Sequence, residues 1–202
     1  MVHMVSVSPE KSLKDALRHL QLPGKDSHKG QNGRLLVIGG SSIFHAASIW
    51  AAEAASRLVD MVHYSSTKEN GEIMVNLKSH FVDGIVIHQK DVLSYVEEDD
   101  CILIGPGMER GEVSESVKSA SLTFEKICQL ENEAEYTYAL IRFLIQQYPE
   151  KKFVFDAAAL QMMDVAWLAQ LKTMPIVTPH CKEFEALFTT DLCNMPLEEK
   201  KE

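Results

Sequence analysis

The amino-acid sequence predicts an α/β domain of three layers (αβα), in which helices cover both faces of a mostly parallel sheet. Short apolar runs of strand length, at 35–38, 101–104 and 153–155, alternate with segments whose apolar residues recur at helical spacing. Each run is continuous, as in strands buried on both faces, and each ends at a glycine or an aspartate. Strands that alternate with helices in this way form parallel sheets.

The elements follow in a regular order along the chain. Helical spacing of apolar residues predicts helices at about 46–58, 131–148 and 160–171 and one that begins near 184. Strands are expected at 35–38, 61–64, 101–104, 153–155 and 175–177, with further extended segments at 72–77 and 84–88.

Two polar stretches carry weaker signals. The stretch 111–130 has weak periodicity, so we expect a loop with a short helix there. The acidic run 97–100 precedes an apolar strand, and we interpret it as a solvated turn with no functional role.

Length and composition predict a single domain over residues 1–202. A chain of 202 residues can bury a sizeable core, and 46% hydrophobic with 24% charged residues is typical of soluble globular proteins. Within it we expect an N-terminal helix in 1–24, which starts with a capping box at Ser12 and ends at Pro23-Gly24. The α/β region then spans 25–188.

Charge and cysteine usage limit the partners. The formal net charge of -9 argues against nucleic acid, and a phosphorylated ligand would be held by local groups such as backbone amides. We expect no membrane partner, because the chain has no uncharged apolar run of 18 residues, and the N-terminus does not read as a signal peptide. Four widely spaced cysteines are typical of reduced thiols in a cytoplasmic protein.

Four unusual segments follow predicted strands, at 39–42, 105–107, 156 and 178–180. In an open parallel sheet the ligand crevice lies outside the carboxyl ends of the strands, so these segments are expected to meet at one edge. Gly39, Gly40 and Ser41 would let backbone amides approach a phosphate, or they form a plain strand-to-helix turn. The Gly-Pro-Gly turn that contains Gly107 has the same two interpretations.

Three side chains complete the candidate set, each with a structural alternative. Asp156 could hold a metal ion or accept a hydrogen bond from a hydroxyl, or it caps the next helix. His180 could contact a ligand, or it forms a capping arrangement with Glu183. Lys29 is the best-placed local cation, or it is a solvated loop lysine.

Taken in order, these segments resemble the NAD(P)H-hydrate dehydratase family, a carbohydrate-kinase-like domain of the ribokinase-like superfamily. The resemblance runs from about Lys25 to Phe188. The matching segments are 28–30, 33–41, the alanine-rich helix from Ala46, 104–107, 155–160 and 178–184.

The resemblance implies a ribokinase-like fold and a repair reaction on hydrated NADH or NADPH (NADHX or NADPHX). The added hydroxyl would be phosphorylated by ADP or ATP with Mg²⁺, and phosphate would then be eliminated. Substrate contacts carry over to Ala47, Gly107 and His180. The other candidates, Gly39, Gly40, Ser41, Lys29 and Asp156, stand where a phosphate and metal region is expected. The resemblance also favours a homo-oligomer.

One expected feature has no counterpart in the sequence. The family carries a Gly-x-Gly-Asp loop, which supplies the nucleotide site and the aspartate base, and nothing from Thr189 to Glu202 resembles it. We therefore assign no catalytic base and expect a domain that lacks the C-terminal nucleotide-binding portion and is inactive by itself. The alternatives are a small-molecule kinase of the same superfamily and a non-catalytic dinucleotide-binding remnant.

Overall fold

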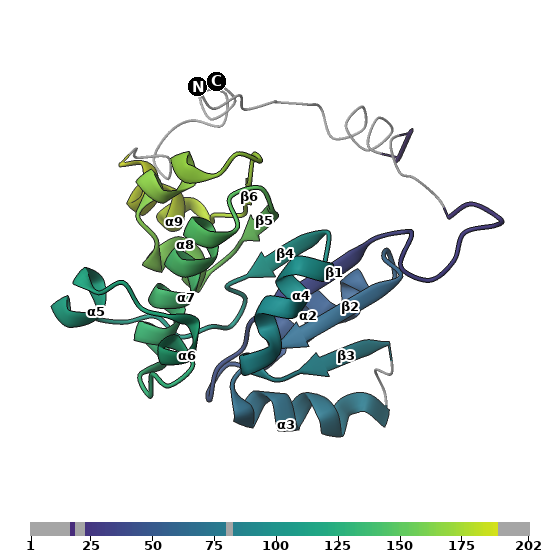
Figure 1. The fold of residues 1–202 in the computed structure, drawn as a ribbon, viewed down its shortest axis with the longest axis horizontal. Coiled ribbons are helices and arrows are strands. Elements are labelled where there is room, and N and C mark those ends of the chain that lie inside the picture. The colour runs from purple at the N-terminus through teal and green to yellow at the C-terminus, as the bar shows by residue number, and fades with distance from the viewer. Residues whose placement is uncertain (1–16, 19–22, 80–82, 190–202) are drawn as a thin grey trace.

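A computed structural model describes residues 17–18, 23–79 and 83–189, and its centre is a six-stranded sheet (Figure 1). All neighbouring strands pair in parallel, in the order β3-β2-β1-β4-β5-β6. The strands are β1 (Arg34–Ile38), β2 (Met61–Ser65), β3 (Gly84–Ile87), β4 (Cys101–Ile104), β5 (Lys152–Phe155) and β6 (Ile176–Val177). The predicted α/β architecture is confirmed.

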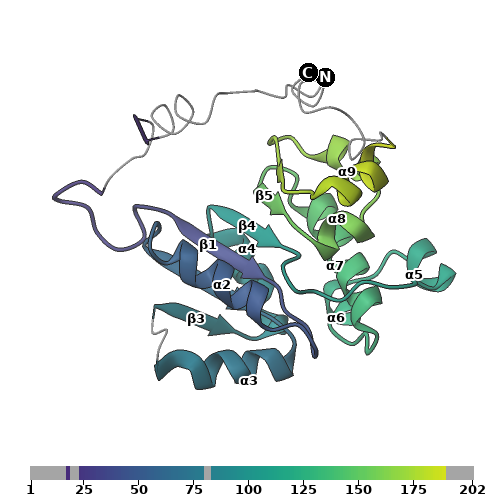
Figure 2. The same cartoon turned by 180° about the vertical axis from the view of Figure 1, so that it is seen from behind.

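A helix follows each strand of the sheet, and the helices lie on both of its faces (Figures 1 and 2). The α-helices are α2 (Ala46–Ala55), α3 (Lys68–Asn76), α4 (Val92–Glu98), α5 (Glu115–Ser119), α6 (Phe124–Ile127), α7 (Glu133–Gln147), α8 (Ala158–Met162) and α9 (Cys181–Phe188). Within the described residues the short 3₁₀ helices are η1 (Leu77–Ser79), η2 (Gln89–Asp91) and η3 (Val165–Gln170).

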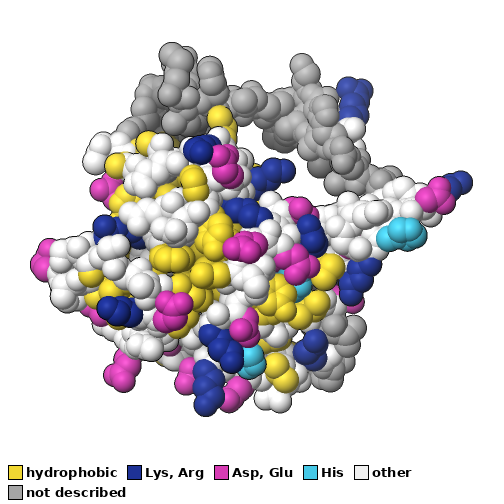
Figure 3. All heavy atoms as spheres, in the orientation of Figure 1, with side chains coloured by type: hydrophobic (Ala, Val, Ile, Leu, Met, Phe, Trp, Pro, Cys, Tyr) yellow, Lys and Arg dark blue, Asp and Glu magenta, His cyan; other side chains and the backbone are white. Residues whose placement is uncertain are grey.

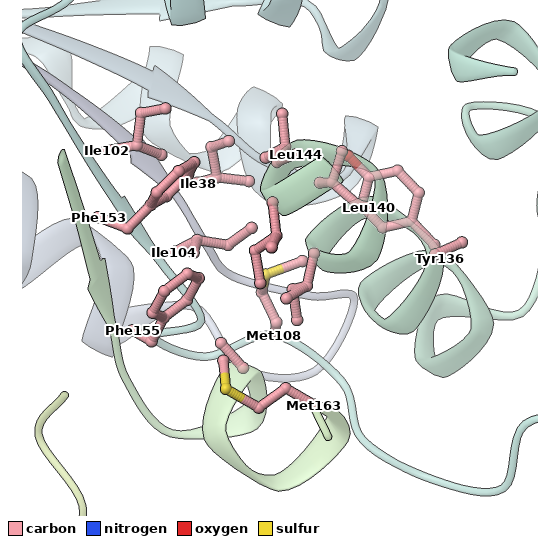
Figure 4. Close-up of a cluster of buried hydrophobic side chains, with 14 of the residues drawn as sticks. Ile38, Ile102, Ile104, Met108, Tyr136, Leu140, Leu144, Phe153, Phe155 and Met163 are labelled. Atoms are coloured by element: carbon pink, nitrogen blue, oxygen red, sulfur yellow. The ribbon is translucent and has the colours of Figure 1, made fainter. Parts of the chain in front are cut away.

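The two faces of the sheet build two separate cores. Successive side chains of a strand point to opposite faces, so Val37 of β1 joins α2 and α3 while Leu36 and Ile38 join α4, α6 and α7. The second core is the larger and is drawn in Figure 4, where Phe153 and Phe155 of β5 face Leu140 of α7. Each fully buried apolar side chain of this kind contributes about 1.5–3 kcal/mol.

Two of the predicted elements are wrong. Residues 72–77 were expected to be extended, but they belong to α3 and η1, because Thr67 caps α3 by accepting from the backbone N–H of Asn70 and Met74 is buried. The helix expected at 160–171 is broken into α8 and η3. Asp164 causes the break, since its side chain accepts from the N–H of Ala166 and starts a new turn.

The acidic run 97–100 is also not the solvated turn that its composition indicated. Asp99 is fully buried, and both of its carboxylate oxygens lie 2.8 and 2.9 Å from Nδ1 of buried His63. Lys151 donates to the carbonyl oxygens of Glu97 and Asp99, which joins this turn to the start of β5. The short α4 before it had no sequence prediction, and α5 and α6 occupy the stretch 111–130 that was expected to hold a short helix.

The helix expected within 1–24 and the tail after Thr189 lie outside the described residues. Within the described ranges, no helix is long and apolar enough to cross a membrane.

Candidate functional site

The loops after β1 and β4 pack against each other at the carboxyl edge of the sheet. The N–H of Gly105 donates to the carbonyl of Ile38 at 3.1 Å, and the N–H of Gly40 donates to the carbonyl of Pro106 at 2.8 Å. These backbone bonds bring Gly39, Gly40 and Gly107 together, as the sequence predicted from their positions after neighbouring strands. We call these residues, with Gly105, the glycine centre.

The glycine centre has no room for side chains. A Cβ on Gly105 would lie 1.8 Å from the carbonyl oxygen of Asp156, and one on Gly40 would lie 2.0 Å from Nδ2 of Asn70. A Cβ on Gly107 would lie 3.1 Å from the carbonyl oxygen of Phe44. All three glycines have positive φ, between +70° and +120°. Backbone rather than side chains therefore forms this surface, which lets a ligand approach closely.

Ser41 and Ala47 flank the glycine centre at the start of α2. Ser41 is buried, and its Oγ accepts from the N–H of Phe44, which closes a tight turn before the helix. Ala47 lies exposed in the first turn of α2, where no side chain caps the helix N–H groups. The segment before α2 approaches Gly107, since a Cβ at that glycine would lie 3.1 Å from the carbonyl oxygen of Phe44.

A buried polar cluster next to Gly40 has no counterpart in the sequence predictions. Nδ2 of Asn70 donates to the hydroxyl of Tyr64 and, at 2.8 Å, to Oγ of Ser66, while its Oδ1 lies 2.7 Å from Nδ1 of His45. Burial raises the pKa of Tyr64, so its hydroxyl stays protonated. Asn70 lies on the inner face of α3, a helix that the sequence analysis did not predict.

Asp156 lies beside the glycine centre at the end of β5. Its Oδ1 accepts from the hydroxyl of Thr178 at 2.6 Å, so the carboxylate is tied to the end of β6. The N-cap of α8 is Ala157, with φ 44° and ψ -115°, so the alternative that Asp156 caps this helix through its side chain is not supported. Positive φ costs a non-glycine residue about 1–3 kcal/mol, and such strain clusters at functional sites.

His180 begins α9 at the same edge. It forms the predicted capping box, in which Nδ1 of His180 accepts from the N–H of Glu183 and the N–H of His180 donates to Oε2 of Glu183 at 3.0 Å. Gln161 donates to Oε1 of Glu183 and in turn accepts from Arg110, both at 2.6 Å. Because Nδ1 is an acceptor here, a neutral His180 carries its proton on Nε2. The side chain is 62% exposed, so capping leaves it accessible to a ligand.

Lys29 does not join the other candidates. It lies in the loop before β1, at the amino edge of the sheet, and the whole of β1 separates it from Gly39. This loop is held by Asp60, whose Oδ2 accepts from the N–H groups of Gly30 and Asn32. Those hydrogen bonds, above all the one from Asn32, lower the pKa of Asp60.

The cysteines depart from expectation at one position. Cys101 and Cys128 are free thiols, and burial raises the pKa of Cys128 to about 11. Cys181 is disulfide-bonded, so the expectation of four reduced thiols is wrong there.

Charged groups near this edge are of both signs. On the face shown in Figure 3, acidic and basic side chains are interspersed around a central group of hydrophobic ones. The described residues contain no group of three or more His, Cys, Asp or Glu side chains that could hold a metal ion by themselves.

The parallel sheet with its glycine centre at the carboxyl edge places the chain in a known class, the ribokinase-like α/β proteins. The fold matches a ribokinase-like superfamily protein from Enterococcus faecalis with a TM-score of 0.64 and 20% identity, over 92% of this chain and 58% of that chain. It also matches the ADP/ATP-dependent NAD(P)H-hydrate dehydratase from Bacillus subtilis, co-crystallized with ATP/Mg²⁺ (TM-score 0.62, 18% identity, 93% of this chain and 58% of that chain). At these identities the likeness shows the fold.

The sequence identifies the particular family. The model of the NAD(P)H-hydrate dehydratase family matches residues 35–201, so the chain belongs to that family. It is 29% identical over 179 residues to the bifunctional NAD(P)H-hydrate repair enzyme Nnr of Methanothermobacter thermautotrophicus, covering 84% of this chain and 30% of the relative. It is 28% identical over 170 residues to the ADP-dependent (S)-NAD(P)H-hydrate dehydratase of Lactiplantibacillus plantarum, covering 80% and 51%. The chain thus spans about half, or less, of these two relatives.

Proposed function

We propose that this chain supplies the dinucleotide-binding part of an ADP- or ATP-dependent NAD(P)H-hydrate dehydratase. In this repair reaction the added hydroxyl of NADHX or NADPHX is phosphorylated and phosphate is eliminated to restore the reduced coenzyme. The described residues would bind and orient the substrate. The proposal assigns substrate contacts to Ala47, Gly107 and His180.

The glycine centre is the observation that carries this proposal. Gly39, Gly40 and Gly105 are packed so closely that an added Cβ would lie within 2.4 Å of another atom, and a bare backbone surface beside the exposed first turn of α2 suits a long ligand with phosphate groups. His180 stands beyond Asp156 on the same edge, with Nε2 3.4 Å from Oε1 of Glu183, and its exposed imidazole ring would donate from Nε2 to the substrate.

The carboxylate of Asp156 is a suitable ligand for Mg²⁺ at this edge. The ion is commonly bound by one or two carboxylates together with substrate phosphates, and Asp156 offers one carboxylate next to the glycine backbone. Bound there, Mg²⁺ would neutralise phosphate charge. The expected Gly-x-Gly-Asp loop is not found among the described residues, so we derive no phosphoryl-transfer step from them. We infer that this chain binds substrate without turning it over.

Calorimetry with NADPHX tests the proposal on the 202-residue chain. We expect binding, and we expect His180→Ala and Gly107→Ala each to weaken it about tenfold, because one removes a donor and the other inserts a methyl group beside Phe44. Lys172→Ala is the matched control, since this lysine forms an exposed ion pair with Glu150 away from the edge. No binding by the unaltered chain would refute the proposal, and ATP-dependent repair by it would refute the inferred lack of turnover.

We also infer that the chain forms a homo-oligomer through the outer face of α2. Phe44, Trp50 and Leu58 are 53%, 68% and 73% exposed, and Ala47 and Ala54 are exposed beside them. A continuous apolar helix face of this size is typical of a protein interface. A second copy docked there would cover Ala47 and so help to enclose the substrate. The cytoplasmic location stays a prediction from the sequence.

Light scattering on a sizing column tests the α2 face. Trp50→Glu places a charge at the centre of the face, so we expect the mass to fall to that of a monomer, while Lys172→Ala leaves it unchanged. An unchanged mass for Trp50→Glu would exclude this face as the interface.

A further inference from the structure

A large cavity opens at the carboxyl end of β3, apart from the glycine centre. Its volume is about 720 Å³, within the range of sites that enclose a small organic ligand. It lies between α3, the segment after β3 and the end of α6, on the lower side of the view in Figure 1. The predicted site residues do not line it.

The floor and the rim of this cavity differ in chemistry. Val75, Val86, Ile87 and Cys128 are the apolar part of the lining, which we call the apolar floor and against which a flat ring could lie. The Cys128 thiol stays protonated at neutral pH, because burial raises its pKa to about 11, so it acts there as an apolar group.

The rim is basic although the whole chain is acidic. Lys68, His88 and Lys90 line it, and Glu72 is the acidic side chain among the lining residues. No ion pair to Lys68 or Lys90 occurs within the part of the chain that the structure describes, whereas Lys118 and Lys172 each bind a glutamate. The rim can therefore offer two positive charges to a phosphate group.

The position of Lys68 supports a role in binding. It is the first residue of α3, directly after the capping Thr67. A cation at this end of a helix is opposed by the helix dipole. A residue such as Lys68, which is unfavourable for the stability of its helix, is often found at a functional site.

The cavity borders the glycine centre at Ser66. This residue lines the cavity, and its Oγ would lie 2.7 Å from a Cβ on Gly40. Gly40 in turn lies close to Gly107, since a Cβ added at Gly107 would lie 3.4 Å from the Cα of Gly40. Two strand spacings separate β1 from β3, so a path of about 10 Å joins the two places.

We propose that this cavity binds the phosphoadenosine end of the dinucleotide, with the adenine ring on the apolar floor and the 2′-phosphate at Lys68 and Lys90. The proposal rests on the proposed function, and it makes the site selective for the phosphorylated coenzyme. The nicotinamide end would then lie across the glycine centre toward His180.

Adenosine 2′,5′-bisphosphate, which lacks the nicotinamide half, is the direct probe. We expect calorimetry to detect its binding to the 202-residue chain. Gly71→Trp should abolish this binding, because Gly71 lines the cavity and a Cβ there meets no atom within 4 Å, so the indole can fill the space without disturbing the backbone. Gly71→Ala, with a side chain too small to fill the cavity, is the matched control and should bind normally.

The lysines are tested by comparing the two coenzymes. In a Lys68→Ala/Lys90→Ala variant we expect affinity for NADPH to fall at least tenfold and affinity for NADH to fall less than threefold. Lys172→Ala controls for loss of one surface charge. Equal losses for NADPH and NADH, or binding of adenosine 2′,5′-bisphosphate unchanged by Gly71→Trp, would overturn the proposal. Absence of binding by adenosine 2′,5′-bisphosphate would also overturn it. If the bisphosphate binds as expected and NADPHX does not, the proposed function fails instead.

Discussion

The glycine centre and the polar network at His180 lie on the same edge of the sheet but are built in opposite ways. In the glycine centre, backbone touches backbone, and Gly105 leaves less than one atom of space before the carbonyl of Asp156. At His180, side chains form the contacts, and Glu183 links Gln161 to the backbone of the helix start. An added methyl group at Gly40 or Gly105 would therefore overlap other atoms in the first region, while the second region depends on the hydrogen bonds of Glu183.

The largest effect is expected from Gly105→Ala. The new methyl group would overlap a backbone oxygen at 1.8 Å, at a residue whose φ is +120°, so both overpacking and backbone strain apply. Together they cost roughly 3–5 kcal/mol. Urea denaturation measures the loss, and Gly71→Ala is the control, because it adds a methyl group in open space within a helix and should stabilise by about 0.5–1 kcal/mol. A Gly105→Ala protein as stable as the unaltered chain would contradict the packing described.

Glu183→Ala should have the next largest effect. It removes the acceptor for the N–H of His180 and for Gln161, and Glu183 is 6% exposed, so water replaces it poorly. We expect a loss of about 1–3 kcal/mol in the free energy of unfolding. Glu183→Gln keeps an amide oxygen in the capping box and should lose less than half as much. Equal losses for the two variants would show that shape rather than hydrogen bonding matters here.

Ala157→Gly changes the residue between the two regions and should stabilise the protein. Ala157 has φ 44°, which glycine adopts without strain, although glycine loses more chain entropy on folding. The net gain is expected to be about 1 kcal/mol, measured by thermal and urea unfolding. Ala159→Gly, in the regular part of α8, should destabilise instead.

The smallest expected effect is a pH-dependent loosening of the loop that Asp60 holds at the amino edge of the sheet, away from both regions. The pKa of Asp60 is lowered in the folded chain, so its contribution is present above the unfolded value near 3.8 and is lost as the pH falls through the lower folded value. We expect faster hydrogen exchange at the N–H groups of Gly30 and Asn32 below about pH 4, after correction for intrinsic rates. Asp60→Asn should remove this pH dependence. Equal changes at Gly40 would point to a global transition.

Much of the fold follows from local signals. The apolar runs that form β1, β4 and β5 are continuous, whereas a strand with one solvent-facing side would alternate apolar and polar residues. Burial on both faces of the sheet could therefore be predicted from them. The predictions failed where a side chain accepts a hydrogen bond from a backbone N–H two or three residues further along the chain. Thr67 starts a helix over a segment expected to be extended, and Asp164 divides a helix expected to be continuous.

Some features of this protein follow from its sequence alone, and others depend on its tertiary structure. The sequence by itself determined the parallel sheet, the meeting of strand ends at one edge and the capping box of His180, because the signals for each are local: apolar runs that alternate with helical patterns, and a histidine three residues before a glutamate. Tertiary structure decided the burial of Asp99 against His63, the cluster around Asn70, the distance of Lys29 from that edge and the cavity beside β3. Those features join residues far apart in the chain, and side-chain packing between helices and strands, which no local pattern encodes, sets them.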